Sequence, residues 1–268
     1  MNFNDLFPIP KPLIACIHLA ALPGSPGYEG SMKKVIESAI WEAEIFNKYG
    51  IDGLIVENFR DNPFYPDQLP PETIAAMTAV TQEIVKVFPR PVGVNALRND
   101  ARSALAISTA SGACFIRVNI HIGAAITDQG IIQGKAHETL RLRKQLNEQV
   151  LIFADVAVKH AAPLGNRTIT DETKDLSTRG MSDAIIVTGN QTGGKTDILD
   201  LQKVKENTAL PVLIGSGVTD KNLKEYYNLA DGFIVGSYFK EEGRASNRVE
   251  ENRVQLLTGV FRSLKSTK

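Results

Sequence analysis

Apolar, β-branched runs of five to eight residues alternate along the chain with amphipathic stretches of ten to nineteen residues. This alternation is typical of strand and helix units around a parallel sheet. The runs are almost continuously hydrophobic, as expected of strands covered on both faces. The pattern predicts eight strands, at Leu13–Leu19, Gly53–Asn58, Pro91–Asn95, Phe115–Asn119, Val150–Val156, Asp183–Thr188, Pro211–Gly215 and Gly232–Gly236. The clearest helical stretches are Ser31–Tyr49, Pro71–Val87, Ala101–Ser111 and Val249–Leu264.

Eight strand and helix units in about 250 residues match the size of a TIM barrel, an α/β fold in which parallel strands close into a cylinder. The rival fold, an open doubly wound sheet, usually has a glycine-rich phosphate loop after its first strand. Here the first loop is Leu22-Pro23-Gly24-Ser25-Pro26-Gly27, whose prolines have no backbone N–H to donate. No linker or change of composition divides the chain. We therefore expect a single (β/α)8 barrel domain over residues 1–268.

Composition and charge narrow the function classes. The 268 residues include 30 basic and 30 acidic side chains, which gives a net charge of zero. This balance does not indicate a protein that binds nucleic acid or anionic lipid. The sequence lacks the ~18 consecutive apolar residues of a membrane helix and the basic, then apolar, order of a targeting signal. We expect a cytoplasmic protein without membrane insertion, and leave a homo-oligomer open. Cys16 and Cys114 lie singly in apolar runs, which favours buried structural thiols.

Polar side chains occupy six of the eight predicted strand ends, where a TIM barrel builds its active site. They are His18, Glu57 with Asn58, Asn95, Arg117 with Asn119, Asp155 and Thr188. Alternate residues of a strand share a face, so an inward Asn119 implies an inward Arg117 one layer deeper. A buried guanidinium needs a carboxylate, and Glu57 and Asp155 are the available partners. The set is either a catalytic site or a polar plug that stabilises the strand register.

The densest group of titratable residues follows the fifth predicted strand, in Asp155-Val156-Ala157-Val158-Lys159-His160. A carboxylate, an amine and an imidazole so close together can supply acid, base or Schiff-base chemistry. The alternative is a surface loop in which Lys159 and His160 are solvated.

Glycine turns follow the last two predicted strands, in Ile214-Gly215-Ser216-Gly217-Val218 and Ile234-Val235-Gly236-Ser237. Glycine lets backbone amides approach a ligand closely, and a helix that starts at Thr219 and Asp220 adds its positive dipole end. Many TIM barrels bind phosphate at this place, and the paired turns resemble those of the ribulose-phosphate-binding barrels. The turns therefore predict a phosphate site, with tight turns that bind nothing as the alternative.

A further run, Gly189-Asn190-Gln191-Thr192-Gly193-Gly194-Lys195-Thr196, satisfies the P-loop pattern G-x-x-x-x-G-K-T. A working P-loop also needs a magnesium-binding aspartate on a second strand of a nucleotide-binding sheet, a geometry that a closed barrel does not present. We interpret the run as a glycine-rich lid over the barrel mouth, in which Thr192, Gly193 and Lys195 reach a phosphate. Nucleoside triphosphate hydrolysis and a turn that binds nothing are the alternatives.

Five groups of residues, spread over most of the chain, can be compared with known families as a set. They are His18-Leu19 with Leu22-Pro23-Gly24-Ser25-Pro26, Ile55-Val56-Glu57-Asn58-Phe59, Asp155-Val156 with Lys159-His160, Val187-Thr188-Gly189 with Thr192-Gly193, and Gly215-Ser216-Gly217. The set resembles the BtpA family, which includes SgcQ-like proteins, over roughly residues 8 to 264. The resemblance implies a TIM barrel. It implies little about the reaction, because one branch is linked to photosystem I biogenesis, another lies among sugar-phosphate metabolism genes, and SgcQ-like members have carried a nucleoside triphosphatase label.

The leading hypothesis is an enzyme that acts on a small phosphorylated metabolite, a sugar phosphate, by acid and base chemistry. Glu57 and Asp155 are its expected acid/base pair, Asn119 and Lys159 bind or polarise the substrate, and His160 is a second acid or base. The expected binding residues are Gly215, Ser216, Gly217, Gly236, Ser237, Thr192, Gly193, Lys195, His18, Asn95 and Arg117. No cofactor is firmly implied, and a divalent cation that joins Glu57 and Asp155 is left open. A noncatalytic assembly factor is the second hypothesis and the triphosphatase the third.

Overall fold

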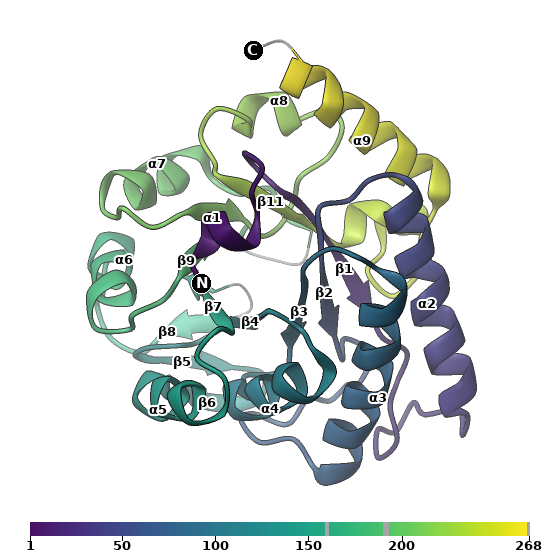
Figure 1. The fold of residues 1–268 in the computed structure, drawn as a ribbon. Coiled ribbons are helices and arrows are strands. Elements are labelled where there is room, and N and C mark those ends of the chain that lie inside the picture. The colour runs from purple at the N-terminus through teal and green to yellow at the C-terminus, as the bar shows by residue number, and fades with distance from the viewer. Residues whose placement is uncertain (159–160, 190–192, 267–268) are drawn as a thin grey trace.

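In the computed structural model, which describes residues 1–158, 161–189 and 193–266, eight parallel strands close into a barrel with helices around it (Figure 1). The strands follow one another around the barrel in chain order, and the last one pairs with the first. Each strand lies inside one of the eight predicted runs, so the predicted TIM barrel is confirmed. The strands are β1 Leu13–His18, β2 Gly53–Glu57, β3 Val92–Asn95, β4 Phe115–Val118, β7 Leu151–Val156, β9 Ala184–Val187, β10 Val212–Ile214 and β11 Gly232–Val235.

A helix follows each barrel strand and covers the outside of the barrel (Figure 1). Helix α3 begins at Pro71 and α4 ends before Gly112, whose φ of 85° is left-handed, and both boundaries are as predicted. The helices are α2 Met32–Lys48, α3 Pro71–Val87, α4 Ala101–Ser111, α5 Ala136–Leu146, α6 Ile169–Thr178, α7 Ile198–Glu206, α8 Leu223–Tyr226 and α9 Glu251–Ser266, with short 3-10 helices η1 Ser237–Phe239 and η2 Glu241–Gly243. None of the helices in the described ranges has the length and apolar character needed to span a bilayer.

The expected start of the helix after β10 is wrong. Helix α8 begins at Leu223, not at Thr219, and has four residues. The backbone N–H of Thr219 donates instead to Oδ1 of Asn222, at 2.7 Å, in the turn before the helix. A phosphate at this end of the barrel therefore depends on the amides of the turns and not on a helix dipole.

Strand side chains alternate between the barrel interior and the layer beneath the helices. Ile14, Phe115 and Phe153 belong to the interior cluster, whereas the next residues along the strands, such as Ala15 and Ile116, pack against helices. This alternation is what the two-residue period of a strand dictates. The polar residues at the strand ends continue the inward series, so they lie above an apolar floor.

An N-terminal helix, α1 (Phe3–Leu6), covers the amino-terminal end of the barrel (Figure 1). The Phe3 ring lies 5.6 Å from that of Phe153 and the Phe7 ring 6.1 Å from that of Phe115, measured between centroids. The helix has four residues, too few for a helical hydrophobic period to be recognised in the sequence. This end of the barrel is packed with aromatic rings. The polar strand ends lie at the opposite, carboxyl end of the strands.

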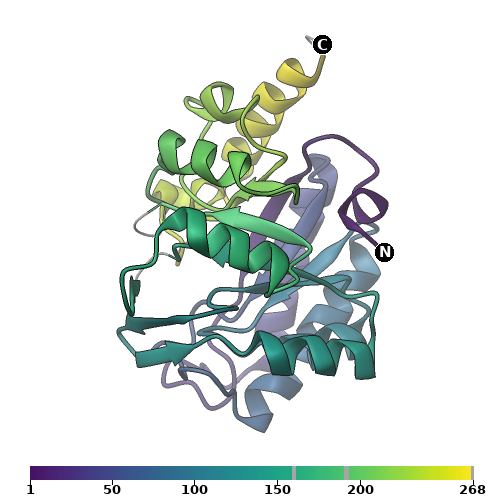
Figure 2. The ribbon, with the colours of Figure 1, turned by 90° about the vertical axis from the view of Figure 1, so that its left-hand side faces the viewer.

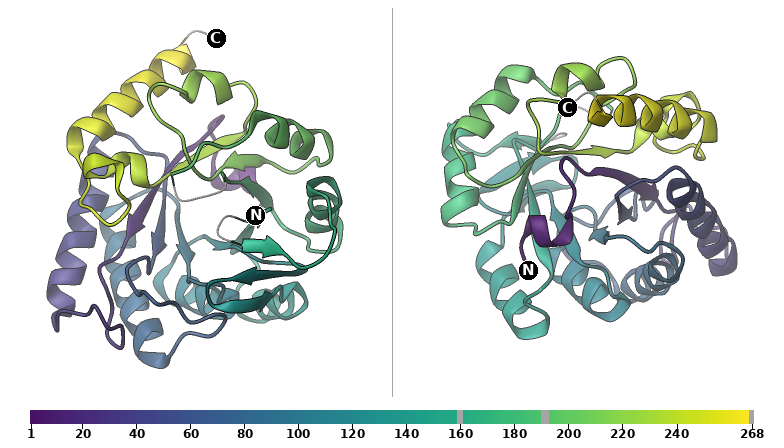
Figure 3. Two further views of the ribbon diagram at one scale, coloured as in Figure 1. Left: turned by 180° about the vertical axis from the view of Figure 1, so that it is seen from behind. Right: turned by 45° about the horizontal axis from the view of Figure 1, so that its top comes forward.

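Three short strands that were not predicted form an antiparallel sheet with the order β6-β5-β8. They are β5 Ala124–Thr127, β6 Gly130–Gln133 and β8 Ala161–Pro163. The sheet lies at the end of the barrel away from α1, as the side view and the view from behind show (Figures 2 and 3). Its strands have three or four residues each, too few for a hydrophobic period to be recognised in the sequence.

Candidate functional site

A cavity of about 560 Å³ opens at the carboxyl end of the barrel strands. It lies where the sequence analysis placed the site, because its lining includes the strand ends of β1 to β4 and the turns after β10 and β11. The predicted residues that line it are His18, Glu57, Asn95, Arg117, Asn119, Gly193, Gly215, Ser216, Gly217, Gly236 and Ser237. Tertiary structure thus brings together eleven residues from seven segments of the chain.

Glu57, at the end of β2, receives several donors although its side chain is buried. Asn95 Nδ2 donates to Oε1 at 3.1 Å, and Arg117 Nη1 lies 3.4 Å from the same oxygen. The Cys16 thiol is 4.0 Å from Oε1. These contacts replace the hydrogen bonds to water that a buried carboxyl group loses.

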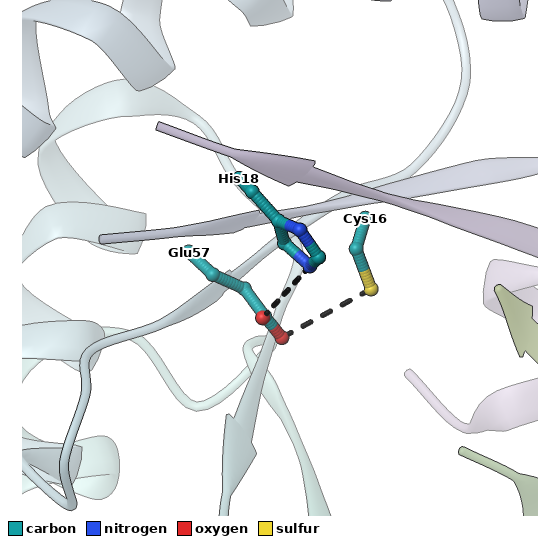
Figure 4. A group of neighbouring side chains, drawn as sticks. All are labelled: Cys16, His18 and Glu57. Atoms are coloured by element: carbon teal, nitrogen blue, oxygen red, sulfur yellow. Dashed lines mark hydrogen bonds and ion pairs between the residues drawn. The ribbon is translucent and has the colours of Figure 1, made fainter. Parts of the chain in front are cut away.

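His18, at the end of β1, faces Glu57 across the strand pair (Figure 4). Its Nδ1–H donates to the carbonyl oxygen of Ala245 at 2.8 Å, which directs Nε2 toward Oε2 of Glu57, 3.6 Å away. The imidazole also stacks on the Phe59 ring, with centroids 4.3 Å apart. Backbone and ring contacts therefore hold the imidazole in one orientation.

Arg117 is the buried cation that the sequence predicts, and both expected carboxylates lie beside it. Asp155 accepts two hydrogen bonds from it, at 2.9 and 3.0 Å, whereas Glu57 makes one longer contact of 3.4 Å. Asn119 Nδ2 also donates to Asp155, at 3.0 Å. Asp155 is buried beside these two residues and is not among those that line the cavity. The geometry thus gives Glu57 and Asp155 different surroundings, although the sequence treated them as a pair.

Asn119 carries a buried acceptor without a donor among the described residues. Its Oδ1 has no hydrogen-bond partner there, while its Nδ2 is bound to Asp155. A buried, unpaired amide oxygen is unfavourable unless a ligand or water satisfies it. Since Asn119 lines the cavity, this oxygen is placed to accept a hydrogen bond from a hydroxyl group of a ligand.

The two glycine turns line the same cavity as Glu57. A Cβ on Gly236 would lie 3.1 Å from the His18 ring, and a Cβ on Gly215 would lie 3.4 Å from Nη2 of Arg117. Gly217 has a left-handed φ of 71°, and a Cβ on it would lie 2.2 Å from the carbonyl oxygen of Gly194. Within the described residues, the backbone amides of Gly217 and Ser237 donate no hydrogen bond to the chain. Free amides on two neighbouring turns are the donors that an anion requires.

The described part of the P-loop-like run folds onto the β10 turn. The Gly189 amide donates to Oγ of Ser216 at 2.7 Å, and the Thr196 hydroxyl donates to the Ser216 carbonyl at 3.1 Å. The Lys195 ammonium instead pairs with Glu225 at 2.8 Å, and its side chain is 56 % exposed. Lys195 is therefore not among the residues that line the cavity, whereas Gly193 is. Lys159, His160 and Thr192, which were also predicted site residues, lie outside the described residues.

Two charged residues of the cavity wall escaped the sequence analysis. Arg98 is three residues beyond the end of β3, and Asp128 lies in the turn between β5 and β6. Burial lowers the pKa of Arg98 below its ordinary value, while Asp155 and Asp128 oppose that shift. Arg98 lies beyond the last residue of its strand, and Asp128 lies in a small sheet that the sequence does not predict. Phe59, Phe64 and Tyr238 add aromatic walls.

Comparisons with known proteins agree with this architecture. The model of the BtpA family matches residues 9–262. An uncharacterized protein of Pyrococcus furiosus is 45 % identical over 95 % of this chain and 96 % of its own length. The photosystem I biogenesis protein BtpA of Synechocystis sp. is 41 % identical over 99 % of this chain and 93 % of its own. Among solved structures, thiamine phosphate pyrophosphorylase from Pyrococcus furiosus has a TM-score of 0.57 at 11 % identity, over 95 % of this chain and 96 % of that one.

Proposed function

The chain belongs to the BtpA family, and we propose that it is an enzyme that acts on a small phosphorylated metabolite, a sugar phosphate, in the cavity at the carboxyl end of its barrel. The proposal is supported by one observation above all. One cavity is lined by the turns of Gly217 and Ser237, whose backbone amides have no acceptor among the described residues, and by a buried carboxylate, Glu57. The amides suit an anionic group, and the carboxylate suits a reacting centre of the same ligand.

The residues of the carboxylate side have distinct proposed roles. Glu57 and His18 are the groups placed to accept and return a proton, because both line the cavity. Arg117 stabilises negative charge that develops on the substrate, and Asp155 is a positioning residue that orients Arg117. Asn119 accepts a hydrogen bond from a substrate hydroxyl through Oδ1, and Asn95 orients Glu57. Lys159 keeps its proposed role of binding or polarising the substrate, and His160 keeps its proposed role as a second acid or base.

On the phosphate side, the turns of Gly215-Ser216-Gly217 and Gly236-Ser237 supply amide donors, and the Ser237 hydroxyl is a further donor. Gly193 closes the site from above, since a Cβ on it would lie 2.8 Å from Oγ of Ser237.

A matched pair of variants tests the phosphate site. Ser237→Asp adds a negative charge beside the amides. Ser237→Asn adds a side chain of nearly the same shape as aspartate but without the charge. The binding of a panel of sugar phosphates and of the corresponding free sugars is measured by calorimetry. We expect at least one sugar phosphate to bind to the wild-type protein and its free sugar to bind at least tenfold more weakly. Ser237→Asp should weaken sugar phosphate binding by more than about tenfold, which is 1.4 kcal/mol, and Ser237→Asn should not. Equal losses in both variants, or equal binding of the free sugar, would contradict the proposal.

A second candidate is a noncatalytic role in assembly, because the relative from Synechocystis sp. is a photosystem I biogenesis protein. A scaffold does not require buried charges around a cavity, and those charges favour the enzyme. If no member of the panel binds to the wild-type protein, the assembly role becomes the better explanation.

A further inference from the structure

Cys16, His18 and Glu57 form a cluster that the proposed acid and base chemistry uses only in part (Figure 4). Cys16 and His18 are two residues apart on β1, so both side chains point to the barrel interior. Glu57 is the register partner of His18 on β2. One ligand atom from each residue lies within 4.8 Å of the other two, and all three side chains are buried.

The spacing of these atoms is close to that of a tetrahedral metal site. Metal bonds of 2.0–2.3 Å to sulfur, nitrogen and oxygen place neighbouring ligand atoms about 3.4–3.6 Å apart. Here His18 Nε2 is 3.6 Å from Oε2 of Glu57, and Cys16 Sγ is 4.0 Å from Oε1. The third separation, between Cys16 Sγ and His18 Nε2, is within 4.8 Å, so the cluster has to contract when it binds an ion.

The orientation of His18 supports a coordinating role. Because Nδ1 carries the proton that is donated to the Ala245 carbonyl, a neutral imidazole presents the Nε2 lone pair to Glu57. Metal-bound histidines are usually oriented in this way, with the second ring nitrogen donating to a carbonyl or carboxylate. A lone pair aimed at a carboxylate is repulsive unless a proton or a metal ion lies between them.

We propose that Cys16, His18 and Glu57 bind one divalent metal ion, with Zn²⁺ as the preferred ion. A thiolate, an imidazole and a carboxylate form a mixed donor set that suits Zn²⁺ and not Mg²⁺ or Ca²⁺, which take oxygen ligands. Three protein ligands leave a fourth position, and the cavity that all three residues line gives a small molecule access to it.

The local charges accommodate such an ion. The thiol proton leaves to the solvent on binding, so the thiolate and the Glu57 carboxylate together balance the two positive charges. Arg117 lies 3.4 Å from Glu57 and would repel a cation, but Asp155 neutralises it through two hydrogen bonds. The competing explanation of the same geometry is a protonated His18 paired with Glu57 beside a neutral thiol.

This inference deepens the proposed function, because it rests on the same cavity and names what its Glu57 side holds. With the ion bound, Glu57 and His18 are both ligands, so Lewis-acid activation takes the place of the proton transfer that the metal-free site assigns to these two residues. Ion binding is measured without any phosphorylated compound, and sugar phosphate binding is measured on Ser237 variants, so each idea can fail alone.

The test uses the full chain after dialysis against a chelator, with Zn²⁺ alone as the titrant and Mg²⁺ as the comparison. We expect one Zn²⁺ per chain, release of a proton on binding, and a thiolate-to-metal absorption band when Co²⁺ replaces Zn²⁺. Cys16→Ser should weaken Zn²⁺ binding by about 100-fold or more and abolish the band. The matched control is Cys114→Ser, which removes the other thiol of the chain and should bind as the wild type does.

A second measurement covers the event that Cys16→Ser does not fold. In the Cys114→Ser protein Cys16 is the single remaining thiol, and Zn²⁺ should slow its alkylation at least tenfold. The absence of saturable Zn²⁺ binding, the absence of protection, or a band that disappears in Cys114→Ser and persists in Cys16→Ser overturns the proposal. Those results would leave the ion pair of His18 and Glu57 as the explanation.

Discussion

Arg117 on β4 and Asp155 on β7 are joined by two hydrogen bonds, from Nε to Oδ1 at 2.9 Å and from Nη2 to Oδ2 at 3.0 Å. Both side chains are buried, and they point inward from paired parallel strands. Burial alone lowers the pKa of Arg117, but Asp155 and Glu57 raise it above its ordinary value. The guanidinium therefore stays charged, and Asp155 contributes most of the stabilisation that offsets the burial of that charge.

Replacing the two carboxylates by their amides should have unequal effects on stability. Asp155→Asn removes the bidentate partner of a buried cation, which typically costs about 3–5 kcal/mol of unfolding free energy. Glu57→Gln leaves that pair intact, and we expect a loss of about 1 kcal/mol or less. Urea denaturation of the two variants measures the difference. Similar losses would mean that Arg117 depends on both carboxylates, and a stable Asp155→Asn protein would contradict the role of Asp155 as anchor.

Two glycines with opposite surroundings provide a test of the barrel packing. A Cβ on Gly93 of β3 would lie 2.3 Å from the Phe115 ring, whereas a Cβ on Gly259 of α9 meets nothing within 4 Å. We expect Gly93→Ala to lower the unfolding free energy by roughly 1–3 kcal/mol or more, because the ring must move in a packed core. Gly259→Ala should raise it by about 0.5–1 kcal/mol, since alanine is the better helix former. Thermal and urea unfolding give both signs.

The buried His121 should make the protein less stable in mild acid. Its Nε2–H donates to the Gly180 carbonyl at 2.8 Å, and its Nδ1 has no partner among the described residues. Burial lowers the pKa of His121 below the ordinary 6.5, although the bond to Gly180 opposes the shift. The unfolded chain therefore takes up a proton on His121 more readily than the folded protein does. The unfolding free energy is highest above pH 6.5, and part of it is lost as the pH falls through the pKa of His121 in the folded protein.

The matching variant is His121→Gln, which keeps an N–H for Gly180 and cannot titrate. Its unfolding free energy should change less than that of the wild type between about pH 7.5 and 5. Parallel pH profiles of the two proteins would assign the acid sensitivity to other groups.

The P-loop-like run should not hydrolyse nucleoside triphosphates by a Walker mechanism. In such a mechanism the lysine contacts the β and γ phosphates, whereas Lys195 is paired with Glu225 and half-exposed. We expect Lys195→Ala to leave any Mg²⁺-dependent ATP or GTP hydrolysis unchanged, as does the nearby exposed control Lys224→Ala. Robust hydrolysis that is lost only in Lys195→Ala would establish the triphosphatase instead.

The strands and the end of the barrel that carries the site follow from the sequence alone. Hydrophobic period and β-branched content are local properties, and each of the eight strands lies within its expected run. The inward direction of Arg117 and its need for a carboxylate also follow, because strand alternation and the cost of a buried charge hold for any barrel. The short strands of the small sheet and the single-turn α1 do not follow, since they form only against the rest of the chain.

What only the tertiary structure decided is how the polar residues share their partners. Asp155 and Glu57 are both acidic strand-end residues in the sequence, yet one is occupied by Arg117 and the other lines the cavity with Cys16 and His18. Likewise the Lys195 ammonium lies on Glu225 although its motif predicts a phosphate contact. Distances between side chains of different strands depend on the register and tilt of a closed barrel, which no local pattern of residues encodes.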